Sequence, residues 1–339
     1  MGGLGLCAGD RPGAPVGFGG AAAGRPQLLA HLPRRHRRGP RGRRRNHGYR
    51  RRGSLQLVQF VHHGATRCGF VEGDGDDATV VELDWSLRDA LVLLTTGQGD
   101  RITGAQNGRV KLSDVVLLPP VTPASRIFCI GINYLDHQQE SMDVFLATVP
   151  KAPVVFMKDL SSIAGPFDQL DLPSSLSVEF DWEAELGVVI GAPARNISEE
   201  DSWDVVAGYT VVNDVSVRDR QVRHVQWTLG KNAPASTPIG PGIVDRDTVG
   251  IKPDIEVTCR VNGVVKQNAF TRDLIFDIPR LISEISQVTP LLPGDIIVSG
   301  TAAGVGFKRN PPEFLREGDV VEVEIAGVGK ISNKVRTEC

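Results

Sequence analysis

The sequence has 339 residues, enough for one large domain or two moderate ones with a sizeable hydrophobic core. Hydrophobic residues make up 41% of it and charged residues 23%, an ordinary composition for a soluble globular protein. The longest apolar stretches, such as residues 114–121, are short and interrupted by proline, which argues against a membrane protein.

The net charge of −2 hides an uneven distribution. Residues 1–52 contain 13 arginines, no lysine and one acid, so they carry +12 and the rest of the chain carries −14. The Gly, Pro, Ala and Arg of residues 1–53 show no apolar periodicity and predict disorder. The segment has three interpretations: a nucleic-acid-binding arm, a targeting peptide, or translated upstream DNA that is not native coding sequence. Arginine without lysine favours the third, and the acidic remainder argues against a nucleic-acid partner.

The five cysteines are odd in number and widely scattered, with no CxxC pair and no zinc-ligand spacing. This pattern indicates free thiols in a reduced, cytoplasmic protein.

Residues 54–120 predict a small N-terminal domain. Residues 55–61 alternate between apolar and polar side chains, and residues 66–71 and 78–83 follow after turns rich in Gly and Asp, which is typical of an antiparallel β meander. Residues 86–94 have helical spacing, and the proline pair that ends at residue 120 marks the boundary of the unit.

Residues 124–338 predict a second, larger domain. Its one clear helix covers residues 278–286, with Pro279 in the first turn. Short strands are expected at residues 127–132, 154–157, 182–190, 205–214, 255–261, 295–298 and 320–325. Strands and helices do not alternate as in a doubly wound sheet, so we expect a β-rich α+β fold.

The most informative segment is residues 180–190. In a strand, Asp181, Glu183 and Glu185 share one face, and the strand then becomes wholly apolar. Carboxylates crowded on one face of a strand that enters a core repel one another unless a cation neutralises them. Hard oxygen ligands favour Mg²⁺, Mn²⁺ or Ca²⁺ over zinc. The alternative is an acidic face that is simply solvated.

A second apolar strand, within residues 208–219, passes through Asp214, which can supply a third carboxylate at the strand's end. Arg218 and Gln221 follow closely and could bind a carboxylate group of a substrate, Arg218 as a two-pronged donor. The alternative for Arg218 is a surface ion pair with Asp219.

Five segments resemble, in order, the motifs of the fumarylacetoacetate hydrolase superfamily. They are residues 130–140 ("GxNYxDHxxE"), 181–186 ("DxExEL"), 208–219 ("GYTxxNDVSARD"), 226–231 ("QWxxGKS") and 293–306 ("PGDxIxTGTPxGVG"). The resemblance covers about residues 54–338. It implies that residues 124–338 form a mixed β-sandwich or roll catalytic domain behind the small N-terminal meander domain.

The resemblance also implies Glu183, Glu185 and Asp214 as ligands of Mg²⁺ or Mn²⁺, with Ca²⁺ less favoured. It implies a catalytic pair, His137 and Glu140, in a lid segment. That pair makes independent sense, because side chains three residues apart on a helix are neighbours, so Glu140 can orient His137 to take a proton from water.

Further roles follow from the same resemblance. Lys231 corresponds to a lysine beside the metal that stabilises developing enolate charge. The expected substrate-binding residues are Arg218, Gln221 and Thr301. The sequence departs from the family motifs at residues 232–241 and 302–303, which we expect to lie beside the pocket and to change its shape.

We therefore expect a metal-dependent hydrolase that cleaves a C–C bond of a 2,4-diketo acid, of the acylpyruvate or fumarylpyruvate type, through a metal-bound enolate. The alternative is an oxaloacetate-type decarboxylase or a 2-hydroxydienoate isomerase that uses the same metal site. The expected ligand is a small 2-oxo acid, and the resemblance suggests a homodimer.

Overall fold

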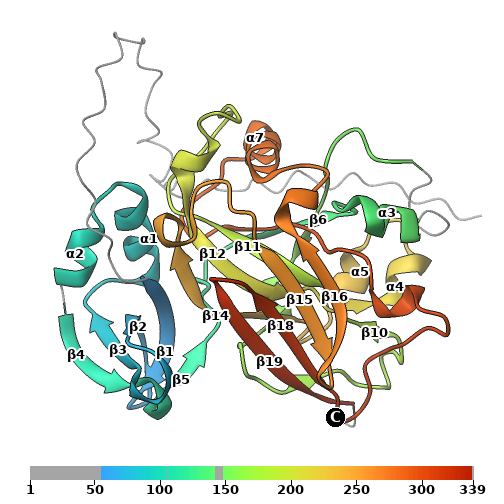
Figure 1. The fold of residues 1–339 in the computed structure, drawn as a ribbon, viewed down its shortest axis with the longest axis horizontal. Helices are drawn as coiled ribbons and strands as arrows, with labels where there is room; N and C mark the ends of the chain where they lie inside the picture. Colours follow the sequence, from blue (N-terminus) through green and yellow to red (C-terminus); the bar gives the residue numbers. More distant parts are fainter. Residues whose placement is uncertain (1–54, 105, 142–147, 338–339) are drawn as a thin grey trace, which may run out of the picture. The chain divides into compact units, whose positions relative to one another are not determined.

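The computed structural model describes residues 55–104, 106–141 and 148–337 (Figure 1). The predicted disorder of residues 1–53 concerns a segment outside these described residues. The described residues belong to one unit of the chain, residues 48–339. The division near residue 120 stays a prediction, and strand β1 (Gln56–His62) of the expected first domain pairs with strand β14 (Thr237–Asp245) of the second.

One large mixed sheet contains twelve strands among the described residues. Its main path, in spatial order, is β4 (Gln106–Lys111), β3 (Thr79–Leu83), β2 (Ala65–Glu72), β1, β14, β12 (Val206–Asn213), β11 (Ala184–Ile190), β17 (Ile296–Val298), β6 (Ile127–Gly131) and β7 (Val154–Lys158). Two short strands, β5 (Val116–Leu118) and β8 (Ile163–Ala164), pair with β1 and β14. The predicted antiparallel meander is present as β1, β2 and β3.

Strands β11 and β12 lie in the interior of the large sheet, and every one of their residues is buried. Continuous burial on both faces explains why their sequences are apolar rather than alternating. The strand predicted over residues 182–190 is interrupted at Trp182 and Glu183. The chain forms a short strand β10 (Phe180–Asp181), which pairs with β13 (Ser216–Val217), before β11 begins.

A second sheet of five strands packs against the face formed by β11 and β12. Its spatial order is β16 (Val264–Phe270), β15 (Glu256–Val261), β18 (Val320–Ile325), β19 (Gly329–Arg336) and β9 (Leu170–Asp171). Leu186 and Val211 of the large sheet share one buried apolar cluster with Val257 and Val323 of the second sheet. Burial of this apolar surface between the two sheets is the main stabilising contribution.

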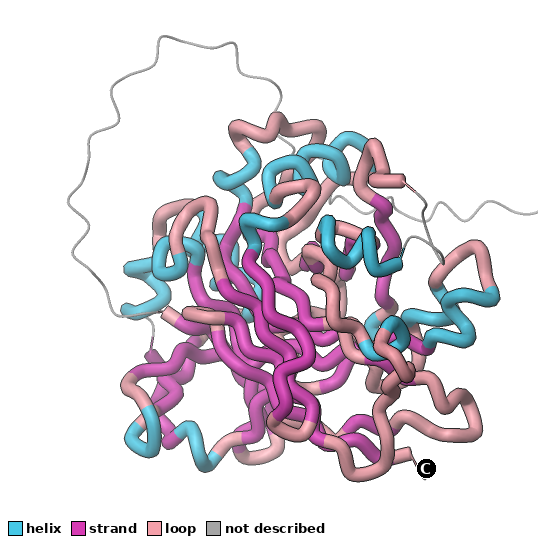
Figure 2. The backbone as a smooth tube through the Cα atoms, turned by 45° about the vertical axis from the view of Figure 1, so that its right-hand side comes forward, coloured by secondary structure: helices cyan, strands magenta, loops and turns pink. Residues whose placement is uncertain are grey.

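Seven α-helices surround the strands of the described chain (Figures 1 and 2): α1 (Leu87–Thr95), α2 (Gly99–Gly104), α3 (Leu135–Ser141), α4 (Arg218–Arg223), α5 (Thr228–Lys231), α6 (Arg246–Val249) and α7 (Ile278–Val288). Helix α7 begins as predicted, with Pro279 in its first turn and the Asp277 side chain accepting from the Arg280 amide. No described helix is long and apolar enough to cross a membrane. The predicted β-rich α+β fold is confirmed.

Candidate active site

Three buried carboxylates meet where β11 begins and β12 ends. Glu183 precedes β11, Glu185 is its second residue, and Asp214 directly follows β12. The antiparallel register places Ala184 opposite Asn213, and the Asp214 amide donates to the Glu183 carbonyl oxygen at 2.9 Å. One carboxylate oxygen from each of the three residues lies within 4.8 Å of the other two. The structure thus brings together the three residues expected to bind a metal.

Three buried cations surround the carboxylates. The Lys231 ammonium donates to Glu183 Oε2 at 2.6 Å and to Asp214 Oδ2 at 2.9 Å. Lys158 Nζ donates to Asp214 Oδ1 at 2.6 Å, and its side chain is completely buried. Arg218 Nη1 lies 2.8 Å from Glu183 Oε1. Lys158 was not predicted from the sequence, because a single lysine at the end of a short strand carries no local signal of such a role.

Asp181, the first acid of the segment, is completely buried and has a different task from the other three. It accepts from Arg218 Nε at 2.8 Å and from the amides of Gly306 and Phe307 at 2.6 and 3.1 Å. The break between β10 and β11 separates Asp181 from the cluster, so it positions Arg218 instead. The prediction that Arg218 lies in the pocket, rather than in a surface pair with Asp219, agrees with this position.

The surroundings shift the pKa values of Glu183 and Glu185 in opposite directions. Burial alone would raise the pKa of Glu183, but Lys231 and Arg218 outweigh it and lower that pKa to about 2. Burial, and then the charges of Asp214 and Glu183, raise the pKa of Glu185 well above its ordinary value. Glu185 accepts from the Gly300 amide at 2.6 Å. It is therefore the carboxylate whose charge the described residues compensate least.

This donor set fits a hard divalent cation. It offers carboxylate oxygens and no sulfur or imidazole within the cluster of three, which favours Mg²⁺, Mn²⁺ or Ca²⁺ over zinc. A cation would also compensate the charge of Glu185, whose hydrogen-bond partner in the described part of the chain is the Gly300 amide rather than a lysine or arginine. The residues present could therefore hold a metal ion.

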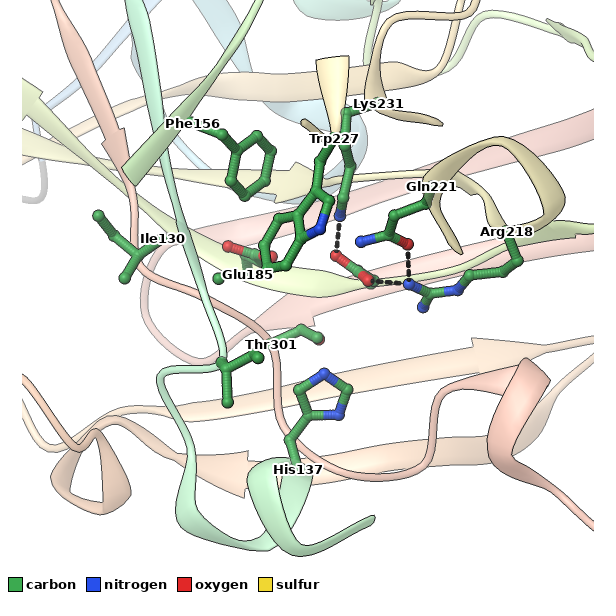
Figure 3. Close-up of a pocket in the computed structure, with 12 residues that line it drawn as sticks. Ile130, His137, Phe156, Glu185, Arg218, Gln221, Trp227, Lys231 and Thr301 are labelled. Atoms are coloured by element: carbon green, nitrogen blue, oxygen red, sulfur yellow. Dashed lines mark hydrogen bonds and ion pairs between the residues drawn. The ribbon is translucent and has the colours of Figure 1, made fainter. Parts of the chain in front are cut away.

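Helix α3 carries the predicted His137–Glu140 pair. His137 Nδ1 lies 3.4 Å from Glu140 Oε2, and the Gly304 amide donates to both Glu140 oxygens at 3.3 Å. His137 is 4% exposed. Glu140 thus connects helix α3 to the loop after Thr301, and in Figure 3 the imidazole of His137 lies across the cavity from Lys231.

Five of these charged and polar residues line one small cavity: His137, Glu183, Glu185, Arg218 and Lys231. Its volume of about 20 Å³ is room for an ion or a water molecule. Besides the polar groups, its wall contains Ile130, Phe156 and Trp227 (Figure 3). The rings of Phe156 and Trp227 meet edge to face, with their centroids 5.5 Å apart. Neither aromatic residue was predicted from the sequence to line the site, although Trp227 lies within the motif at residues 226–231.

The expected substrate-binding residues also border the cavity. Gln221 Oε1 accepts from Arg218 Nη1 at 2.7 Å, and Arg218 Nη2 is buried with no hydrogen-bond partner among the described residues. Thr301 Oγ1 donates to the Ala184 carbonyl oxygen at 3.1 Å. Residues 232–241 and 302–303, where the sequence departs from the family motifs, are absent from the described cavity lining.

Comparison with known proteins identifies relatives of this arrangement. The family model described as "Fumarylacetoacetate (FAA) hydrolase C-terminal" matches residues 126–336. The rat protein named oxaloacetate tautomerase Fahd2a, mitochondrial, is 44% identical over 236 residues, which are 69% of this chain and 74% of the rat protein. The bovine protein named oxaloacetate tautomerase FAHD2A, mitochondrial, is 44% identical over 295 residues, which are 83% of this chain and 92% of the bovine protein.

Solved structures agree with the sequence comparison. A 5-carboxymethyl-2-hydroxymuconate delta-isomerase from Mycobacterium smegmatis is 32% identical with a TM-score of 0.69, covering 84% of this chain and 100% of its own. A fumarylacetoacetate hydrolase from Exiguobacterium antarcticum is 33% identical with a TM-score of 0.71 and the same coverage.

Two expectations change with these relatives. The predicted cytoplasmic localisation is wrong, because the rat and bovine relatives are named as mitochondrial proteins. The prediction rested on scattered free cysteines, which indicate a reducing compartment but do not distinguish one such compartment from another. The names of the relatives also favour the alternative activity, at an oxaloacetate-type or hydroxydienoate substrate, over hydrolysis of a 2,4-diketo acid.

Proposed function

The chain belongs to the fumarylacetoacetate hydrolase family, and from that premise we propose that it interconverts the keto and enol forms of a small 2-oxo diacid of the oxaloacetate type. The proposal includes a divalent cation, Mg²⁺ or Mn²⁺, held by Glu183, Glu185 and Asp214. It is supported by the relatives named as oxaloacetate tautomerases and by the composition of the cavity.

One observation carries the proposal: a proton acceptor and a positive cluster border the same small cavity. His137 lies on one side of it, and Lys231 and Arg218 lie among the carboxylates on the other (Figure 3). Enolisation requires this pair of features, since a proton leaves carbon while negative charge gathers on the neighbouring oxygen. A cation bound at the three carboxylates would supply Lewis-acid polarisation of the 2-oxo and carboxylate oxygens.

The chain's own residues perform the remaining tasks. Glu140 holds His137 through Nδ1, which leaves the other ring nitrogen to take a proton from C3 of the substrate. The electron pair of that C–H bond forms the C2–C3 double bond, and the carbonyl electrons move to the 2-oxo oxygen. In the proposed reaction the proton returns to that oxygen, and the reverse transfers regenerate the ketone.

Lys231 stabilises the negative charge that develops on the oxygen. Burial alone would lower the pKa of Lys231, but the charges of Asp214 and Glu183 outweigh it and raise that pKa above its ordinary value. The ammonium group therefore stays charged at neutral pH. Lys158 keeps Asp214 in place from the other side through its 2.6 Å hydrogen bond.

A 2-hydroxydienoate isomerase is the second candidate, because solved relatives that cover this chain well are named as isomerases of that type. The proton transfer is of the same kind, with the proton returning to a more distant carbon. C–C hydrolysis, in contrast, also needs a nucleophilic water inside the cavity beside the substrate.

Proton exchange in D₂O separates these reactions. With oxaloacetate and Mg²⁺, the proposed tautomerase exchanges the C3 protons for deuterium without cleaving the molecule, and proton NMR measures both events. In the E183Q variant the exchange rate should fall by on the order of 10²-fold or more. Glu200→Gln, at an exposed acid outside the cavity lining, serves as the matched control. Cleavage of an acylpyruvate without any exchange on oxaloacetate would overturn the proposal in favour of hydrolysis.

A further inference from the structure

Trp227 occupies a special place in the cavity wall. Twelve residues line the cavity, and ten of them are buried. The remaining two, Phe156 and Trp227, are partly exposed, so they separate the cavity from solvent. Figure 3 shows the indole beside Phe156, on the side of the cavity that contains Lys231 and Gln221.

The two aromatic residues differ in how the chain holds them. Phe156 lies in strand β7, where it is paired with Cys129 of β6, so its backbone is fixed within the large sheet. Trp227 lies on the connection between helices α4 and α5, directly before Thr228 begins α5. Its neighbours Val225 and Leu229 are 97% and 64% exposed. Trp227 is thus the aromatic wall residue that lies outside the large sheet.

Gly131 provides the space for the indole. A Cβ atom at this position would lie 2.2 Å from Trp227 Cζ3 and 2.6 Å from Cη2, so any side chain here would displace the indole. Gly131 is the last residue of β6 and does not have a left-handed φ, so its backbone does not require glycine. The absence of a side chain therefore serves the contact with Trp227.

The partly exposed rings of Phe156 and Trp227 form the outer part of the cavity wall, opposite the side chains of the acidic cluster. A substrate group that extends outward from the carboxylates must therefore pass the indole. We propose that Trp227 is a specificity-determining residue: its indole, seated on Gly131, limits the size of the substrate group beyond the 2-oxo carbon. This inference rests on the proposed function for the class of ligand, a short 2-oxo acid bound at the three carboxylates.

Helix α5 also connects Trp227 to the charged cluster. Trp227 and Lys231 stand four residues apart, at the two ends of the single turn of α5. The Lys231 ammonium lies 5.0 Å from the centroid of the Phe156 ring, which also contacts Trp227. The indole and the Lys231 ammonium therefore border the same cavity from the two ends of one helical turn.

Binding of two non-enolisable 2-oxo acids tests the inference without turnover. Glyoxylate is short and phenylglyoxylate carries a ring beyond the 2-oxo group, and calorimetry with Mg²⁺ gives the dissociation constant of each. We expect the wild type to prefer glyoxylate. The W227A variant should reduce the ratio of the two constants by on the order of tenfold or more, while L229A, at the exposed neighbour on α5, should keep the wild-type ratio.

Two further variants, G131A and W227F, keep the inference testable if W227A does not fold. In G131A the new methyl group displaces the indole, so its ratio should shift toward that of W227A, and W227F should give an intermediate value. A ratio in W227A or W227F equal to that of the wild type would overturn the inference. The binding test needs no turnover. If W227A shifts the ratio of dissociation constants but the wild type exchanges no protons of oxaloacetate, the proposed function is refuted and the size limit set by Trp227 still holds.

Discussion

Replacing Glu185 by glutamine should remove the stabilisation that Mg²⁺ gives the protein and should not destabilise the metal-free protein. Two unit charges 4.8 Å apart repel by about 3 kcal/mol at an effective dielectric constant of about 20, and Glu185 lies within that distance of both Glu183 and Asp214. Lys231 and Arg218 contact Glu183, whereas Glu185 accepts a hydrogen bond from the Gly300 amide. Glutamine keeps an acceptor for that amide and removes the two repulsions that arise when Glu185 is ionised.

The sign of the pH dependence follows from the raised pKa of Glu185. In the metal-free folded protein this carboxyl keeps its proton above pH 4.5, where the unfolded chain has begun to lose it. The free energy of unfolding of the metal-free wild type therefore falls as the pH rises from 4.5 through the folded-state pKa of Glu185. In E185Q the contribution of this residue to the decrease should be absent. Metal binding should release the proton, so the affinity of the wild type for Mg²⁺ should rise with pH over the same window.

Thermal unfolding with and without Mg²⁺ measures both effects. A cation present at a hundred times its dissociation constant adds about 2.7 kcal/mol, which raises the Tm of the wild type by on the order of 5 °C. E185Q should show little of this rise, and the exposed control Glu200→Gln should show all of it. The same rise in E185Q as in the wild type would refute the assignment of Glu185 as a ligand.

Three other substitutions test separate parts of the site. E140Q removes the charge that orients His137, so it should lower kcat by on the order of 10²-fold with little change in KM. A wild-type kcat in steady-state kinetics would exclude the His137–Glu140 pair as the catalytic base. K231M should lower kcat by a similar factor through loss of a charge-stabilising donor, and deuterium exchange that continues at the wild-type rate would contradict this role. D181N removes one of the two carboxylates that contact the buried Arg218 guanidinium and should reduce the free energy of unfolding by about 3 kcal/mol in a urea titration. An unchanged midpoint would show that the two amide donors, not the ion pair, fix Asp181.

Much of the fold could be predicted because the signals were local. Alternation identified β1 and β2, a proline in the first turn identified α7, and the apolar run of residues 205–214 identified β12. Strand β14 was missed, since its Gly and Pro residues suggest turns, yet long-range pairing with β1 and β12 overrides that preference.

The candidate site was predictable to the extent that its residues lie in ordered motifs. Glu183, Glu185 and Asp214 were grouped through the resemblance to the family motifs, and they meet because β11 and β12 pair in one register, which the sequence did not predict. Lys158 and Phe156 were not found, because strand β7 has no motif and reaches the site only through its place beside β6 in the sheet. Asp181 was grouped with the other acids because the break at Trp182 leaves no trace in the alternation of residues.

The central claim is that a divalent cation at the three carboxylates and His137 together catalyse keto–enol interconversion of an oxaloacetate-type acid. Its most direct test follows the ultraviolet absorbance of enol oxaloacetate as it relaxes to the ketone, with the protein stripped of metal by a chelator and then titrated with Mg²⁺. We predict no acceleration by the stripped protein, and a rate that rises with Mg²⁺ and saturates. Saturating Mg²⁺ that leaves the relaxation at its uncatalysed rate, or equal acceleration by the stripped protein, would contradict the claim.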